Sequence, residues 1–272
     1  MDQFRSGSSM ESDSSLGPRF PLRPVPLGEV GQLLRDSIAP FRFAPLRLTG
    51  LFLVLWIPIL MLVFAQTVGP FLSEIASAVA FAGYTAALDA AARSEPPDFR
   101  HLGVVVRFDF EKLALLMLSG LVPILAAVLA LYGIWGMQET AQFVQGLSSA
   151  DGHPSPRLMI DFEAAEYIAG IPFSFVAPVW ALYRWSGSRS MSANLLACVV
   201  NWRWVLVMTG FEAFADNLLI WMRGQGDDVA ILSDIGVIAT QMLALSWTLA
   251  VAQRSFPLRR SDLASTVSGE IR

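Results

Sequence analysis

Apolar positions gather into six long runs along the chain, and short polar stretches separate them. The runs cover about residues 48–66, 70–92, 113–135, 159–183, 202–222 and 229–252. Each run reaches about 19–25 residues, which is the length a helix needs to cross roughly 30 Å of hydrocarbon. Pro58, Pro123, Pro172 and Pro178 lie inside runs and predict kinks, which neighbouring helices can accommodate. The pattern therefore predicts an all-α protein, a bundle of six transmembrane helices.

A shorter pattern precedes the first, third and fifth runs. Amphipathic stretches lie at about residues 28–40, 99–107 and 191–200, and each leads into an aromatic–charged–aromatic triplet. The aromatic residues of the triplets are Phe41, Phe43, Phe108, Phe110, Trp202 and Trp204. Short amphipathic helices lie flat on a membrane, and aromatic rings favour headgroup depth. We therefore predict three elbow helices, and we interpret the six aromatic residues as interfacial anchors.

The spacing of these features also indicates a threefold internal repeat, each unit being an elbow helix followed by two spans. The units cover about residues 27–97, 98–186 and 187–256, which together form one membrane domain. The alternative is that any helix entering a membrane starts in this way in an aromatic-rich chain. Residues 1–26, rich in Ser and Gly and then in Pro, are predicted to be a disordered tail without a signal peptide, and residues 257–272 form a second tail.

Basic residues are distributed unevenly between the two predicted membrane faces. All but two of the 19 Lys and Arg residues flank the chain ends or follow the second and fourth runs; the exceptions are Arg157 and Arg223. Because short cytoplasmic segments carry the excess of basic residues, both termini are predicted to be cytoplasmic. An even number of spans agrees with that orientation.

Composition supports a membrane protein and excludes several other classes. Apolar residues make up 54% of the chain and charged residues 15%, against about 25% charged in soluble domains. This excludes a disordered chain, a disulfide-rich domain and a nucleic-acid binder. Cys198 is the one cysteine, and the two histidines fall on opposite predicted faces. We therefore predict no metal, no cofactor and no enzymatic activity, with the lipid bilayer as the first partner.

The most informative polar residues are carboxylates inside the apolar runs. Glu212 and Asp216 are four residues apart, so they share a helix face, and Glu212 lies roughly 15 Å beyond Trp202, near the bilayer midplane. Glu74 and Glu166 lie on other predicted helices and could join them. A charged carboxylate at this depth is costly unless it is protonated, hydrogen-bonded, bound to a cation or hydrated. Two interpretations stay open: a cation or proton site, and a hydrogen-bonded group that holds helices together.

Three stretches of the chain resemble a known family. They are the segment Phe41-Arg42-Phe43-Ala44-Pro45-Leu46, the small-residue helix and Arg–x–Glu–Pro loop of residues 83–102, and the Ala-Cys…Asn-Trp elbow within residues 177–202. Together they are similar to a family of uncharacterised proteobacterial six-helix inner-membrane proteins. The resemblance implies a bacterial inner membrane, but it carries over no function and no site residue. Glu212 and Asp216 depart from that family, where apolar residues are expected.

Two classes of function fit these patterns. The first is a non-catalytic scaffold, assembly or accessory component, working with a membrane-protein partner or a second copy of the chain. It is favoured because the sequence indicates no unwound helix pair. The alternative is a small permease or channel for protons, cations or cationic solutes. A permease predicts an acid-lined cavity that reaches Glu212. A scaffold predicts a packed interior and an exposed small-residue face at Ala76, Ala80 and Gly83.

Overall fold

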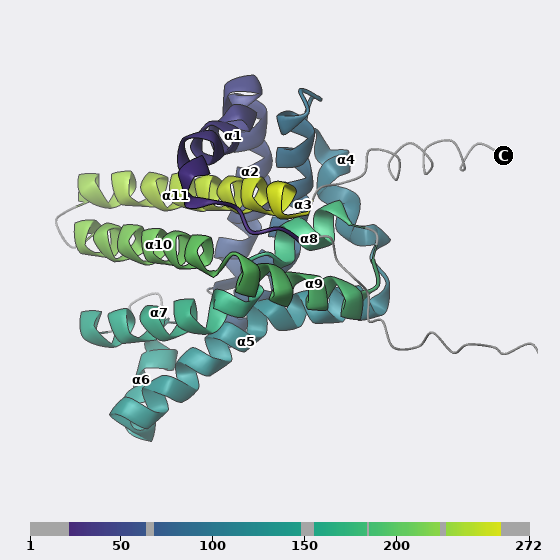
Figure 1. The fold of residues 1–272 in the computed structure, drawn as a ribbon. Helices are drawn as coiled ribbons and strands as arrows, with labels where there is room; N and C mark the ends of the chain where they lie inside the picture. The colour runs from purple at the N-terminus through teal and green to yellow at the C-terminus, as the bar shows by residue number, and fades with distance from the viewer. Residues whose placement is uncertain (1–21, 64–67, 148–154, 184, 224–226, 257–272) are drawn as a thin grey trace, which may run out of the picture.

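The regular structure of this protein is helical throughout the described residues. The computed structural model describes residues 22–63, 68–147, 155–183, 185–223 and 227–256 (Figure 1). Its helices are η1 (Leu27–Glu29), α1 (Val30–Phe43), α2 (Pro45–Val63), α3 (Gly69–Ala92), α4 (Phe99–Leu102), η3 (Gly103–Arg107), α5 (Phe110–Trp135), α6 (Met137–Leu147), α7 (Pro156–Gly170), η4 (Ile171–Phe173), α8 (Val176–Leu182), α9 (Gly187–Val200), α10 (Trp202–Arg223) and α11 (Asp227–Ser255). The predicted all-α helical bundle is confirmed. Of the predicted tails, residues 1–21 and 257–272 lie outside the described residues. Residues 22–26 of the predicted N-terminal tail are described, and they contact the helical domain through Arg23 and the buried Val25.

Five segments are long and apolar enough to cross a membrane. They are Pro45–Leu62, Gly69–Ala92, Phe110–Trp135, Arg157–Leu182 and Leu232–Ser255. A sixth crossing exists only if α9 and the first part of α10 count as one span, and the two helices are bent by 88° at their junction. The chain is thus a multi-pass membrane protein. In that pair the predicted span over 202–222 is represented by Trp202–Leu219, which carries Arg203, Glu212 and Asp216.

The fourth span is interrupted rather than merely kinked. It consists of α7, the short η4 and α8, with the break between Gly170 and Val176. Pro172 lies in the break and has no backbone N–H to continue the helical ladder. Asn194 of α9 replaces the lost bonds: its Oδ1 accepts from the Phe175 N–H at 3.0 Å, and its Nδ2 donates to the Pro172 carbonyl at 2.6 Å. A neighbouring helix therefore stabilises the interruption.

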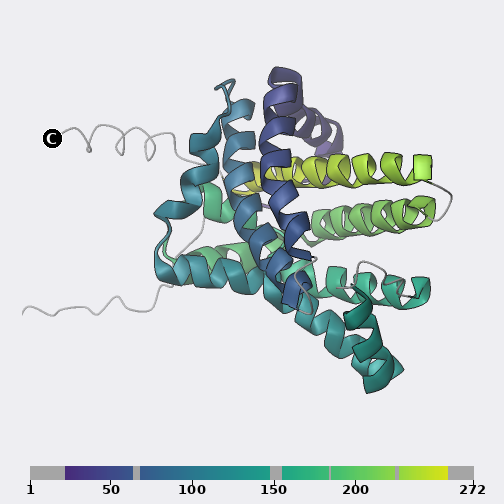
Figure 2. The same ribbon diagram turned by 180° about the vertical axis from the view of Figure 1, so that it is seen from behind.

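The predicted elbows exist but differ in length. α1 and α9 each have 14 residues, whereas the second elbow is the four-residue α4 followed by η3. Asp98 caps α4, and its hydrogen bond with the exposed Arg100 holds the pKa of that carboxyl below its usual range. α6 is a further helix, between the third and fourth apolar runs. The α2–α3 hairpin crosses α10 and α11 steeply in Figures 1 and 2, so the three hairpins do not run side by side. The threefold repeat stays a prediction.

The triplet residues do not all face outward. Phe110 is 87% exposed and Trp202 and Phe43 are also exposed, as expected of anchors at a membrane surface. Phe41 and Phe108 are partly buried against core clusters. Trp204 is only 2% exposed, and its indole N–H donates to the Val25 carbonyl at 2.8 Å. The prediction of an interfacial anchor is therefore wrong for Trp204, because its ring fills the core beneath the N-terminal segment.

The two ends of the described chain meet. The Arg23 N–H donates to the Ser255 carbonyl at 3.1 Å, and the Val25 N–H donates to Asn201 Oδ1 at 2.9 Å. Asn201 also donates through Nδ2 to the Ser255 hydroxyl at 2.8 Å, so one buried amide joins the N-terminal segment to the end of α11. Ends that lie together on one side agree with an even number of crossings.

Candidate functional site: an acid-lined cavity

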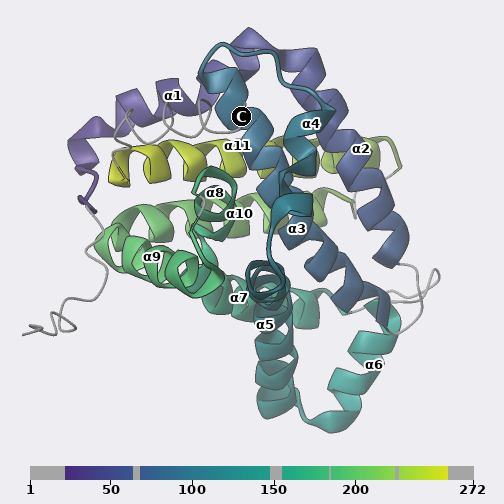
Figure 3. The same ribbon diagram turned by 90° about the vertical axis from the view of Figure 1, so that its right-hand side faces the viewer.

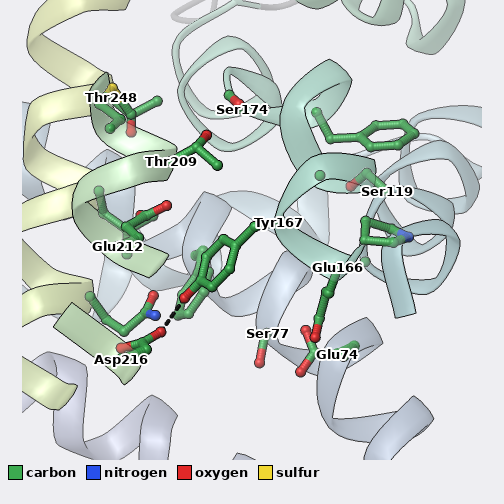
Figure 4. Close-up of a pocket in the computed structure, with 18 of the residues that line it drawn as sticks. Glu74, Ser77, Ser119, Glu166, Tyr167, Ser174, Thr209, Glu212, Asp216 and Thr248 are labelled. Atoms are coloured by element: carbon green, nitrogen blue, oxygen red, sulfur yellow. Dashed lines mark hydrogen bonds between the residues drawn. The ribbon is translucent and has the colours of Figure 1, made fainter. Parts of the chain in front are cut away.

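A cavity of about 400 Å³ lies among α2, α3, α5, α7, η4, α10 and α11. Five carboxylates line it: Glu74, Glu163, Glu166, Glu212 and Asp216 (Figure 4). All four carboxylates that the sequence analysis singled out therefore face one space, although they come from α3, α7 and α10. None of the described lining residues is Lys, Arg or His.

α10 supplies one side of the cavity. Glu212 and Asp216 share a helix face as their spacing predicts, and Thr209 extends that face by one turn. The Tyr167 hydroxyl of α7 donates a hydrogen bond to Asp216 Oδ2, which ties α7 to α10 across the cavity (Figure 4). Glu212 makes no hydrogen bond or ion pair with any described residue. Its carboxylate is therefore available to a ligand.

α3 and α7 supply the opposite side. Figure 4 shows the carboxyl groups of Glu74 and Glu166 beside one another, with Ser77 next to them. Two carboxylates this close repel unless a proton or a cation lies between them. Ser77 is 7% exposed, and its hydroxyl makes no hydrogen bond with a described residue. This side of the cavity therefore presents a buried hydroxyl to a ligand, in addition to the carboxylates of Glu74 and Glu166.

Gly120 allows α3 and α5 to come together at this place. A Cβ atom built on Gly120 would lie 2.4 Å from the Glu74 carbonyl oxygen and 3.0 Å from the Ala78 Cβ. Only glycine permits this approach of the two backbones. The position of Glu74 in the cavity wall thus depends on a residue that carries no side chain.

Aromatic rings form another part of the wall. Trp56 and Phe81 lie parallel with centroids 6.2 Å apart, and Tyr167 and Phe173 also line the cavity. The faces of such rings carry partial negative charge and attract cations. Carboxylates and ring faces together make the cavity a favourable environment for positive charge.

The interruption in the fourth span opens onto this cavity. Gly170, Phe173 and Ser174 belong to the break or its edges, and all three line the space. Pro172 in an apolar run predicted only a kink in this region, so the break was not expected. Tyr167 and Ser77 were not predicted as site residues. The spacing of Glu163, Glu166 and Tyr167 at i, i+3 and i+4 was the available signal for Tyr167, because it places all three on one face of a helix.

The geometry does not resemble a chelating metal site. Among the described residues, no group of three or more His, Cys, Asp or Glu side chains is arranged to hold a metal ion. The carboxylates instead line the cavity from different sides, in two groups on α10 and on α3 with α7 (Figure 4). Cys198 is a buried free thiol away from this space.

The small-residue face predicted for docking is covered at Gly83. Gly83 is buried, and a Cβ built on it would lie 2.7 Å from the Leu102 carbonyl oxygen of α4. Ala76 and Ala80 on the same helix are partly buried. α4 of this chain therefore covers the part of the face at Gly83.

Comparisons of this chain with protein-family models, with curated proteins and with solved structures find no match. The interpretation of the cavity accordingly depends on the chain's own residues.

Proposed function

We propose that this protein is a permease that binds a small organic cation, such as a protonated amine, in the acid-lined cavity and carries it across the membrane. The membrane would be a bacterial inner membrane with both chain ends in the cytoplasm, as the basic residues and the family resemblance predict. One observation carries the proposal. Five carboxylates and no described basic residue line a single cavity inside a multi-pass helical domain.

The size and lining of the cavity support an organic cation over a bare metal ion. A volume of about 400 Å³ lies within the range of small-molecule sites, which runs from about 300 to 1,000 Å³. The carboxylates stand in separate groups, and the aromatic wall of Trp56, Phe81 and Phe173 suits the carbon skeleton of an amine. A cationic group beside Glu212 would compensate the cost of a carboxylate at this depth.

The interrupted fourth span supports transport over a scaffold function. Transporters commonly place their binding site at a broken helix, because freed backbone groups there can face a ligand. Here the break between Gly170 and Val176 lines the cavity. The scaffold interpretation depended on the apparent lack of such a break, and that reason no longer holds.

Thermal unfolding of the purified protein in detergent tests the proposal, with a panel of primary and quaternary amines at pH 7. A ligand that binds the folded state at 100 times its Kd adds about 2.7 kcal/mol to the free energy of unfolding. We expect at least one amine to raise the melting temperature of the wild type in a dose-dependent way. Glu212→Gln should abolish this shift without destabilising the protein, because Glu212 has no hydrogen-bonded partner among the described residues.

Glu139→Gln is the matched control, since Glu139 is an exposed carboxylate on α6, outside the cavity. It should leave the amine response unchanged. The proposal fails if no amine shifts the wild type, or if Glu139→Gln removes the shift as fully as Glu212→Gln does. A positive result leads to uptake measurements in liposomes with the same amine.

A further inference from the structure

A second cavity, of about 680 Å³, lies where η3, the start of α5 and the end of α8 meet. Figure 3 looks at this side of the molecule, with α4, α8 and the first turn of α5 toward the viewer. Two basic residues, Arg107 and Lys112, line the cavity together with one acidic residue, Asp109. None of its described lining residues belongs to the acid-lined cavity.

Lys112 is the one lysine of the chain, and it is only 5% exposed. Its ammonium donates to the Tyr183 carbonyl at 2.8 Å and lies 4.5 Å from the centre of the Phe108 ring. The Trp180 indole donates to the Lys112 carbonyl at 2.9 Å, which fixes the backbone at the same place. An ammonium has three N–H donors, and the described residues accept from one of them. Two donors therefore remain for a ligand in the cavity.

The other charged residues leave the cavity with an excess of positive charge. Arg107 is exposed and makes no hydrogen bond or ion pair with any described residue. Asp109 uses its Oδ1 to accept from the Lys112 backbone N–H at 2.7 Å, where it caps α5. One carboxylate thus stands against two cations, and that carboxylate already has a structural role at the helix start.

We propose that this cavity binds a phosphate group, and that an anionic phospholipid headgroup supplies it. The remaining donors of Lys112 and the guanidinium of Arg107 are suited to phosphate oxygens. Basic pockets between transmembrane helices on the cytoplasmic side bind anionic headgroups. The volume of about 680 Å³ exceeds what a phosphate alone needs, and Trp180 and Trp185 provide an apolar wall for the glycerol of a lipid.

The test uses the full chain, stripped of lipid in detergent, and measures binding by native mass spectrometry and by thermal unfolding. The probes are phosphatidylglycerol, phosphatidylcholine with the same acyl chains, and glycerol 1-phosphate as a headgroup without a tail. We expect phosphatidylglycerol to bind more tightly than phosphatidylcholine. Arg107→Gln should weaken the binding of phosphatidylglycerol about tenfold, as expected for the loss of one charge-assisted hydrogen bond.

Arg42→Gln is the control, because Arg42 is also an exposed arginine and lies outside the cavity. Arg107→Gln should keep the fold, since Arg107 has no described partner. Lys112→Met removes the buried positive charge and keeps a side chain of similar length. Comparable binding of glycerol 1-phosphate would support the phosphate site with a soluble ligand as its source. The proposal is overturned if the two lipids bind equally and glycerol 1-phosphate does not bind, or if Arg42→Gln weakens binding as much as Arg107→Gln.

Discussion

Gly120 controls, at the scale of single residues, how closely α3 and α5 approach beside the acid-lined cavity. Its missing side chain leaves room for the Glu74 backbone, which holds the carboxylate of Glu74 in the cavity wall. Gly133, on the same helix, has no atom within 4 Å of the position of an added Cβ. The two glycines therefore have different roles, although both lie in α5.

Gly120→Ala should reduce the free energy of unfolding by about 1–3 kcal/mol, because the new methyl group forces two packed backbones apart. Gly133→Ala should instead stabilise the protein by about 0.5–1 kcal/mol, since alanine favours a helix where space is open. Thermal or denaturant unfolding in detergent measures both changes. Equal effects of the two substitutions would contradict the close approach at Gly120.

The sequence alone was enough to select four of the carboxylates that line the acid-lined cavity. Glu74, Glu166, Glu212 and Asp216 stand out because a carboxylate in an apolar run is costly and therefore rare. The roles of Lys112 and Asn194 could not be predicted, because they depend on hydrogen-bond partners that lie far away in the sequence. Lys112 bonds to Tyr183, 71 residues later, and no periodicity in the sequence indicates that pair.

The interruption of the fourth span is the main feature at the scale of elements. Two of its backbone groups, the Phe175 N–H and the Pro172 carbonyl, bond to one side chain, that of Asn194, which is fully buried on α9. The sequence predicted the limits of the long helices well, because apolar runs end where polar residues begin. It could not predict the break, because proline inside an apolar run is equally compatible with a kink and with an interruption.

Asn194→Leu should lower the free energy of unfolding by about 2–4 kcal/mol. The substitution keeps the branching of the side chain, but it leaves the buried Phe175 N–H without a partner, at about 1–3 kcal/mol, and it removes the hydrogen bond to the Pro172 carbonyl, at about 0.5–1.5 kcal/mol. Unfolding curves in detergent measure the loss. Ser192→Ala on the exposed side of the same helix should change stability by less than about 0.5 kcal/mol. A similarly small effect of Asn194→Leu would show that the break does not need its side-chain bonds.

At the scale of the whole molecule, six crossings would place the chain ends and the α3–α4 connection on one side of the membrane and α6 on the other. The distribution of basic residues and the contact between Arg23 and Ser255 support this predicted topology. The native Cys198 is buried, so thiols introduced at exposed positions can report on each side separately. Gln138 of α6 and Arg100 of α4 are both exposed.

A membrane-impermeant maleimide should label Gln138→Cys in intact cells with a permeable outer layer. It should label Arg100→Cys only after the membrane is opened. The wild-type protein, which carries Cys198 alone, is the control and should stay unlabelled in both conditions. Labelling of Arg100→Cys in intact cells would reverse the proposed orientation, and labelling of both variants there would contradict the assignment of α4 and α6 to opposite sides.

The contact between the chain ends has a consequence for how the protein is made. Arg23 donates to the carbonyl of Arg254, a residue synthesised 231 positions later, and the segment at Val25 stays without its partners until the chain has grown to Asn201 and beyond. Earlier helices enter the bilayer while the core around Trp204 is still incomplete. α10, which carries two carboxylates, must also wait for α11 before its polar face is enclosed. The core beneath the N-terminal segment is therefore incomplete until α11 has been synthesised.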